Sequence, residues 1–188
     1  MKEILKRNSK GKKVLLLFVL TNLVYAFMLL VTIPKVMDFS GGMQLPDILP
    51  TGYSVEYVKL LFENLGVKGR EAYLFNQIPV DMIYPSLFGI SYCLVLAFFL
   101  NKLKKLDSFL AYACLLPVAA GFFDYLENLG IIQMLRNYPD NSNILIETTN
   151  VFTIVKSAFT SIYFVVLTLV LMAFGVKKFS KKDDKKQV

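Results

Sequence analysis

The chain has 188 residues and a net charge of +7, and 55% of its residues are hydrophobic while only 19% are charged. A soluble domain of this size has to cover itself with polar side chains, whereas lipid accepts apolar surface, so this balance favours a membrane protein. Histidine is absent, which excludes His-based catalytic triads, His proton shuttles and His-ligated zinc or haem.

The basic residues flank apolar blocks instead of forming one continuous surface. Six lie in the first thirteen positions, three lie between Lys102 and Lys105, and six lie between Lys177 and Lys186. Basic flanks orient a membrane helix and attract anionic headgroups. We therefore expect membrane lipids as partners and no nucleic acid.

The first apolar block, residues 14–33, has no charged residue, and twenty helical residues are enough to cross a hydrocarbon core of about 30 Å. It follows Lys10, Lys12 and Lys13 and ends before Pro34. The block is longer than the apolar region of a usual signal peptide, and no small-residue cleavage site follows it. We expect an uncleaved membrane span.

The next segment, residues 34–78, is too long to be a mere connector, and glycines and prolines keep its first third irregular. After this part, Ser54 can cap a helix that ends at Gly66. Four apolar residues with helical spacing share one face of that helix: Val58, Leu61, Phe62 and Leu65. We expect an amphipathic helix that lies on the outer membrane surface or on the other helices.

Three further spans follow in the chain, at about residues 79–100, 108–134 and 146–176. Ser108 is placed to cap the third span. A short basic tail, residues 177–188, closes the chain.

The connections at residues 101–107 and 135–145 are short, and short connections make neighbouring helices antiparallel. The expected fold is therefore all-α: one integral membrane domain over residues 1–188, built as an antiparallel four-helix transmembrane bundle.

Orientation follows from the distribution of lysine and arginine. The N-terminus, the 101–107 connection and the tail hold fifteen of these residues. The other side holds five, which are Lys35, Lys59, Lys68, Arg70 and Arg136. We expect both termini to be cytoplasmic and the protein to lie in the cell (plasma) membrane.

Ionisable residues also occur inside the predicted spans. Asp124 and Glu127 fall in the outer half of the third span, and Lys156 lies about two to three turns below the outer surface on the fourth. Asp81 and Tyr84 lie about one to two turns down the second span. All of them share the outer leaflet.

Helical spacing places these residues on two polar stripes. One consists of Gly121, Asp124, Glu127 and Asn128, and the other of Thr149, Thr153, Lys156, Ser157 and Thr160. Because a charge that faces lipid costs several kcal/mol, we expect the stripes to face each other. Lys156 should then pair with Asp124 or Glu127.

Three acids and one lysine inside the membrane leave spare negative charge. Either Arg70 or Arg136 reaches in, or one acid is protonated, or a cationic ligand completes the cluster. Seven residues form the candidate site: Asp81, Tyr84, Asp124, Glu127, Asn128, Lys156 and Arg70.

Three functions fit this pattern. The first is a module that binds or transports a small amphipathic or cationic molecule or a lipid. The second is an enzyme on lipid or isoprenoid substrates, in which Asp124 or Glu127 acts as acid/base or as ligand to Mg²⁺. The third is an accessory subunit whose polar stripes only join helices. We expect no cofactor apart from Mg²⁺ in the second case, and self-association into a homo-oligomer is left open.

Overall fold

The computed structural model describes residues 1–184, with the side chains of residues 1–178. All regular elements in this part are helical, which confirms the all-α class. Four helical stretches are long and apolar enough to cross a membrane, as expected: Gly11–Met37, Val55–Lys102, Phe109–Asn137 and Asn143–Lys178.

The first stretch follows a short helix, α1 (Lys2–Asn8), and it does not end before Pro34. It consists of α2 (Gly11–Phe27), a π-helical turn (Met28–Thr32) and α3 (Ile33–Met37). A proline inside a helix lacks an amide hydrogen and its ring clashes with the carbonyl four residues earlier. The wider turn immediately before Pro34 accommodates this clash, so the helix continues to Met37.

The second stretch is helical well before residue 79. It consists of α4 (Val55–Ala72), a π-helical turn (Tyr73–Gln77), α5 (Ile78–Asp81) and α6 (Tyr84–Lys102). The Ser54 hydroxyl accepts a hydrogen bond from the Tyr57 amide at 3.1 Å, so Ser54 caps α4. Gly66 has a φ of 57° and a ψ of −169°, so the capped helix ends there as expected, and a second helical part of α4 begins after it.

The other two stretches pair along much of their length. A 3₁₀ segment (Phe109–Leu115), capped by Ser108, leads into α7 (Leu116–Asn137), and α8 (Asn143–Asp184) returns beside it. α6 packs against α2 and α7, whereas α2 makes no extensive contact with α8.

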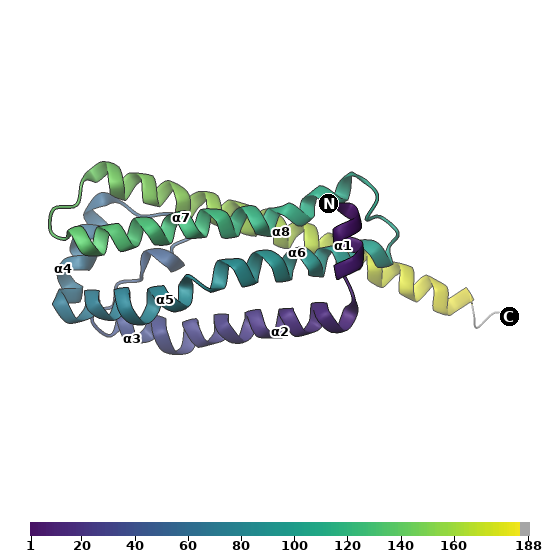
Figure 1. Cartoon of the computed structure of the whole chain (residues 1–188), viewed down its shortest axis with the longest axis horizontal. Helices are drawn as coiled ribbons and strands as arrows, with labels where there is room; N and C mark the ends of the chain where they lie inside the picture. The colour runs from purple at the N-terminus through teal and green to yellow at the C-terminus, as the bar shows by residue number, and fades with distance from the viewer. Residues whose placement is uncertain (185–188) are drawn as a thin grey trace.

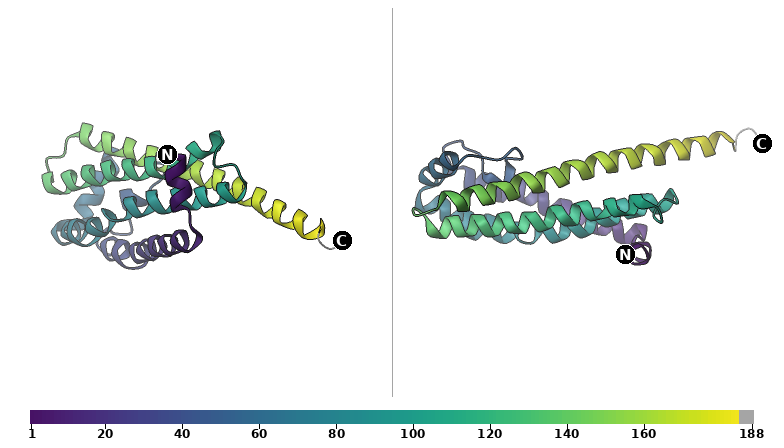
Figure 2. Two further views of the ribbon diagram at one scale, coloured as in Figure 1. Left: turned by 45° about the vertical axis from the view of Figure 1, so that its right-hand side comes forward. Right: turned by 90° about the horizontal axis from the view of Figure 1, so that it is seen from above.

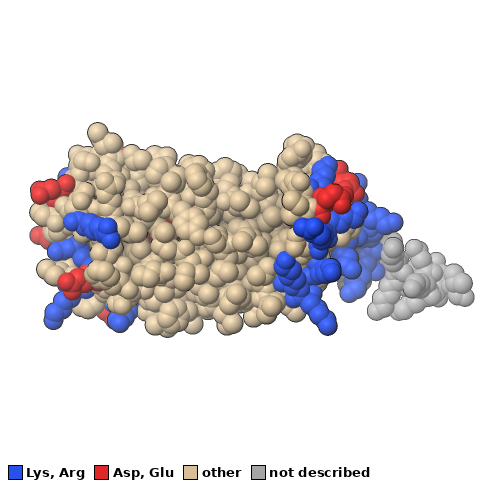
Figure 3. Space-filling view, viewed as in Figure 1, with Lys and Arg blue, Asp and Glu red and all other residues tan. Residues whose placement is uncertain are grey.

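The long helices α2, α6, α7 and α8 lie side by side (Figures 1 and 2). α1 and the last described turns of α8 lie at one end, here called the termini end, and α3 and α4 lie at the other, the loop end (Figure 1). On the face in Figure 3, charged residues gather at these two ends with a broad band of other residues between them.

Two groups of buried apolar side chains hold the helices together. The group toward the termini end is centred on α6 and includes Leu96, Leu100 and Tyr163. The group toward the loop end lies beneath α4 and includes Phe62 and Met134. A cavity is lined by members of both groups, Phe88 and Ala120 of the first and Met28 and Ile33 of the second.

Candidate functional site

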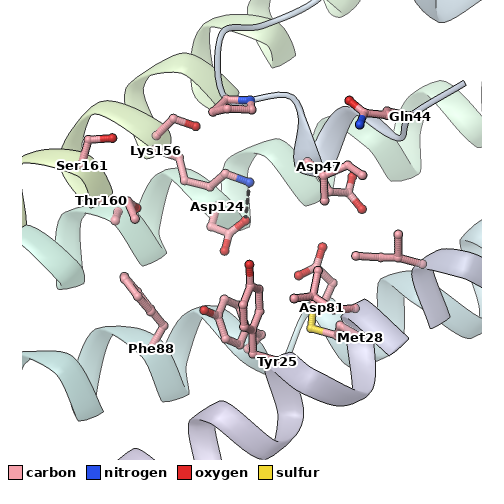
Figure 4. Close-up of a pocket in the computed structure, with 17 residues that line it drawn as sticks. Tyr25, Met28, Gln44, Asp47, Asp81, Phe88, Asp124, Lys156, Thr160 and Ser161 are labelled. Atoms are coloured by element: carbon pink, nitrogen blue, oxygen red, sulfur yellow. Dashed lines mark hydrogen bonds and ion pairs between the residues drawn. The ribbon is translucent and has the colours of Figure 1, made fainter. Parts of the chain in front are cut away.

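The cavity has a volume of about 520 Å³. Its walls come from α2, the loop between α3 and α4, the junction of α5 and α6, α7 and α8 (Figure 4). Its lining includes three acidic residues, Asp47, Asp81 and Asp124, and one basic residue, Lys156.

Lys156 joins α8 to α7 at one wall. Its ammonium lies 3.1 Å from Asp124 Oδ1 and also forms an ion pair with Glu127 Oε2. Thr153 donates to the other oxygen of Glu127 at 2.8 Å. The two polar stripes therefore face each other, and Lys156 contacts both acids instead of one. Glu127 is fully buried behind the cavity wall and does not line it.

The position of Asp81 depends on a break in the helix. Residue 85 is proline and has no amide hydrogen to donate to the Asp81 carbonyl, so α5 ends at Asp81 and α6 begins at Tyr84. The Asn128 side-chain amide donates to that carbonyl at 3.3 Å. Asn128 therefore supports the backbone that carries Asp81, although Asn128 does not itself line the cavity.

The Asp81 side chain has no polar partner in the described part of the chain. The residue is 4% exposed and lines the cavity, with its carboxyl group directed inward (Figure 4). The hydrogen bond at Asp81 involves its backbone, and the ion pairs of this region involve Lys156 with Asp124 and Glu127. A buried carboxyl group without a partner is costly, which makes Asp81 a candidate ligand contact.

The structure adds Asp47 to the site. A short 3₁₀ turn, Pro46–Ile48, presents this residue to the cavity. The Tyr73 hydroxyl donates to one carboxylate oxygen, and the Gln77 side-chain amide donates to the other at 3.4 Å. Thr32 in turn donates to the Gln77 carbonyl oxygen. Two other segments of the chain, the π-helical turns that contain Tyr73 and Gln77 and that contain Thr32, thus fix the direction of this carboxyl group.

Sequence reasoning missed Asp47 because it lies in an irregular segment with no helical period. One signal was present: an acid stands among apolar residues between Pro46 and Pro50, where an exposed loop would be polar. Removal of water by the surrounding protein raises the pKa of Asp47 above its ordinary value.

Aromatic rings form part of the wall beside the acids. Tyr84 stacks on Tyr25 with ring centroids 5.3 Å apart, and Phe88 lies 5.8 Å from Tyr84. All three residues line the cavity. Ring faces attract cations, so this wall is compatible with positive charge and with apolar groups.

Arg70 was expected near the acids, but the structure places it elsewhere. Its guanidinium donates to the Phe62 carbonyl at 2.6 Å and lies 3.9 Å from the centroid of the Tyr138 ring. The break at Gly66 leaves carbonyl groups in the preceding turn without helical partners, and Arg70 satisfies one of them. Arg136 is exposed and does not line the cavity. Neither arginine balances the acids.

The site therefore contains four carboxyl groups, those of Asp47, Asp81, Asp124 and Glu127, and one ammonium group, that of Lys156. In the described part of the chain, no three carboxylate or thiol side chains lie close enough together to hold a metal ion.

No family model, curated protein or solved structure matches this chain. Its function is therefore inferred from the geometry of the cavity.

Proposed function

We propose that the chain is a multi-pass protein of the cell membrane, with four antiparallel spans forming a single domain and both termini in the cytoplasm. The lysine and arginine count supports this orientation, since the N-terminus, the 101–107 connection and the tail hold fifteen of these residues and the segments on the other side hold five. The termini end is then cytoplasmic, and the cavity lies in the outer half of the membrane.

In this orientation the cavity binds a small amphipathic cation. The observation that carries the proposal is the unpartnered carboxyl group of Asp81, buried beside Asp47 and Asp124 around one cavity. Lys156 supplies one positive charge for four acids. A ligand ammonium would reduce this imbalance, and a buried ammonium gains most from carboxylates that are already held in place.

The uncharged walls suit the remainder of such a molecule. Tyr25 and Tyr84 offer ring faces to the charged group, and Met28, Ile33 and Ala120 offer apolar surface. The ligand is therefore expected to carry one amine and an apolar portion.

The cavity is better suited to binding a ligand than to letting it pass freely across the membrane. Its floor toward the termini end consists of packed aromatic rings, with Phe88 4.7 Å from Tyr92 and Tyr92 5.7 Å from Tyr163 between centroids. The Tyr163 hydroxyl also donates to the Tyr92 carbonyl at 2.8 Å. Movement of a ligand to the cytoplasm would require these side chains to separate.

Calorimetric titration of the purified protein with phenylbutylamine and phenylbutanol tests the proposal. The two probes have the same apolar body, but only the amine is charged at neutral pH. We expect saturable binding of the amine that is at least about tenfold tighter than binding of the alcohol, a difference of about 1.4 kcal/mol.

The Asp81→Asn variant should reduce amine affinity to that of the alcohol. The matched control is Asp38→Asn, which removes an exposed acid outside the cavity. The proposal would be contradicted by equal affinity for the two probes, or by amine binding that persists in Asp81→Asn. Either result would indicate that the acids of the cavity are neutralised by protonation and not by a ligand.

A further inference from the structure

The cavity has an opening on the side of the molecule, between α2 and α8. α2 packs against α6, and α8 packs against α7, but α2 and α8 do not close against each other. Three lining residues are exposed at this opening: Tyr25 on α2, Leu29 on the π-helical turn that follows α2, and Ser161 on α8. In Figure 4, Tyr25 and Ser161 lie on opposite sides of the cavity.

Side chains pack at both ends of the cavity. The aromatic rings described above form the floor. Toward the loop end, buried residues such as Leu45, Leu61 and Tyr73 pack beside the cavity, whereas two lining residues of the loop between α3 and α4, Gln44 and Pro50, are exposed. The Tyr57 hydroxyl donates to the Gln44 carbonyl at 2.9 Å and ties the loop to α4. The cavity therefore reaches the surface at the loop as well as between α2 and α8, and a ligand dissolved in lipid would use the second route.

The opening lies at the depth of lipid chains. At 1.5 Å per residue, Tyr25 lies about 18 Å and Leu29 about 24 Å along the helix from Lys13, the last basic residue before the first span. Ser161 lies about 24 Å from Lys177 in the same way. The hydrocarbon core is about 30 Å thick, so the opening faces acyl chains in the outer half.

We infer that the ligand is a lipid-like amine with a single alkyl chain that enters sideways from the outer leaflet. Its ammonium lies by Asp81 and Asp47, and its chain leaves the cavity between Tyr25 and Ser161. The inference rests on the proposed function, because it takes the same cation site and adds that its ligand is dissolved in the membrane. The acidic residues of the cavity favour a ligand with a positively charged amine, and the opening toward lipid favours a ligand with an alkyl chain.

The absence of tryptophan from the chain allows a direct test. Leu29→Trp introduces a single fluorophore at the opening. Leu30→Trp places one at the same depth on the lipid-exposed surface, outside the cavity. Each variant, reconstituted in phosphatidylcholine vesicles, is titrated with dodecylamine brominated in mid-chain, and separately with the brominated dodecanol.

We expect the brominated amine to quench the Leu29→Trp fluorophore saturably and several-fold more strongly than the Leu30→Trp fluorophore. The brominated alcohol should quench both equally and without saturation, because it only partitions into lipid. Adding Asp81→Asn to Leu29→Trp should remove the saturable part. Tyr25→Trp exchanges one aromatic ring for another, so it provides a second reporter that does not enlarge a side chain at residue 29.

Equal and non-saturable quenching of all three reporters, while phenylbutylamine still binds in an Asp81-dependent way, would overturn the lateral lipid-like ligand and leave the cation site intact. Loss of both the saturable quenching and phenylbutylamine binding would overturn the two proposals together.

Discussion

Gly121 of α7 lies directly against the carbonyl oxygen of Pro85 in α6, and a Cβ atom at Gly121 would come within 2.6 Å of that oxygen. No real side chain tolerates this distance, so glycine allows α7 to approach the point where α5 gives way to α6. The contact brings two cavity walls together, because Asp124 stands one turn beyond Gly121 and Asp81 stands one turn before Pro85.

The first prediction tests this contact. Gly121→Ala should lower the melting temperature in detergent, since a methyl group forced into a close-packed interface costs about 1–3 kcal/mol. It should also weaken phenylbutylamine binding by moving Asp124 relative to Asp81. Gly175→Ala is the control, because a Cβ at Gly175 meets nothing within 4 Å. Equal melting temperatures for the two variants would show that the helices separate without cost.

The second prediction concerns Lys156 and its two acids, whose side chains are at most 15% exposed. Breaking a buried ion pair costs about 3–5 kcal/mol, because the remaining charge is left uncompensated. Lys156→Met leaves two acids without their cation, whereas Glu127→Gln leaves Lys156 paired with Asp124. We expect Lys156→Met to lower the melting temperature more than Glu127→Gln, and the double variant to recover part of the loss.

Lys177→Met is the matched control for that series, since its ammonium only donates to the Leu103 carbonyl within the described chain, at 3.3 Å. A Lys156→Met variant that melts at the temperature of the unmodified protein would show that the ammonium makes no net contribution at this depth.

The third prediction is a pH dependence that arises from Asp47. Desolvation raises its pKa above the ordinary value of 3.8, and Asp124 adds to this effect, while the Tyr73 hydrogen bond and the charge of Lys156 oppose it. A carboxyl group with a raised folded-state pKa stabilises the fold below its unfolded pKa. This contribution is lost as pH rises through the folded pKa.

The melting temperature of the ligand-free protein should therefore fall as pH rises from about 4, and the fall should be smaller in Asp47→Asn. Saturating phenylbutylamine should reduce the fall in the unmodified protein, because an ammonium stabilises the ionised carboxylate. Differential scanning fluorimetry across the pH range gives the comparison. Superimposable curves for the two proteins would mean that Asp47 does not titrate in this interval.

The fourth prediction is the membrane topology. An impermeant maleimide added to intact cells should label Asp140→Cys and should not label Lys6→Cys or Lys178→Cys, because positive segments remain on the cytoplasmic side. All three positions are exposed, and the native Cys93 and Cys114 are buried, so the background should be low. Labelling of Lys178→Cys from outside, before the cells are broken, would reverse the proposed orientation.

Much of the helical structure could be predicted from the sequence, because the rules involved act along one helix. Charge-free blocks of spanning length predict the four long helices, and serine before an apolar run predicts the caps at Ser54 and Ser108. The helical period and the cost of an unpaired charge likewise place Lys156 opposite Asp124 and Glu127.

Pro34 shows where these local rules become insufficient. It suggested a helix boundary, yet a π-helical turn, Met28–Thr32, precedes it and the helix continues to Met37. Packing against neighbouring helices offsets the free-energy cost of the irregular turn. The sequence of a single segment contains no information about that packing.

Only the tertiary structure decided which groups share the cavity. Asp47 reaches it because Tyr73 and Gln77, 26 and 30 residues further along the chain, bind its carboxylate. Arg70 does not reach the cavity, because its guanidinium binds the Phe62 carbonyl beside the break at Gly66 and lies over the Tyr138 ring. The first outcome depends on hydrogen bonds between segments far apart in sequence, and the second depends on a hydrogen bond across the Gly66 break together with the Tyr138 ring at the end of α7. Helical periodicity and the cost of placing a charge in lipid describe each segment alone.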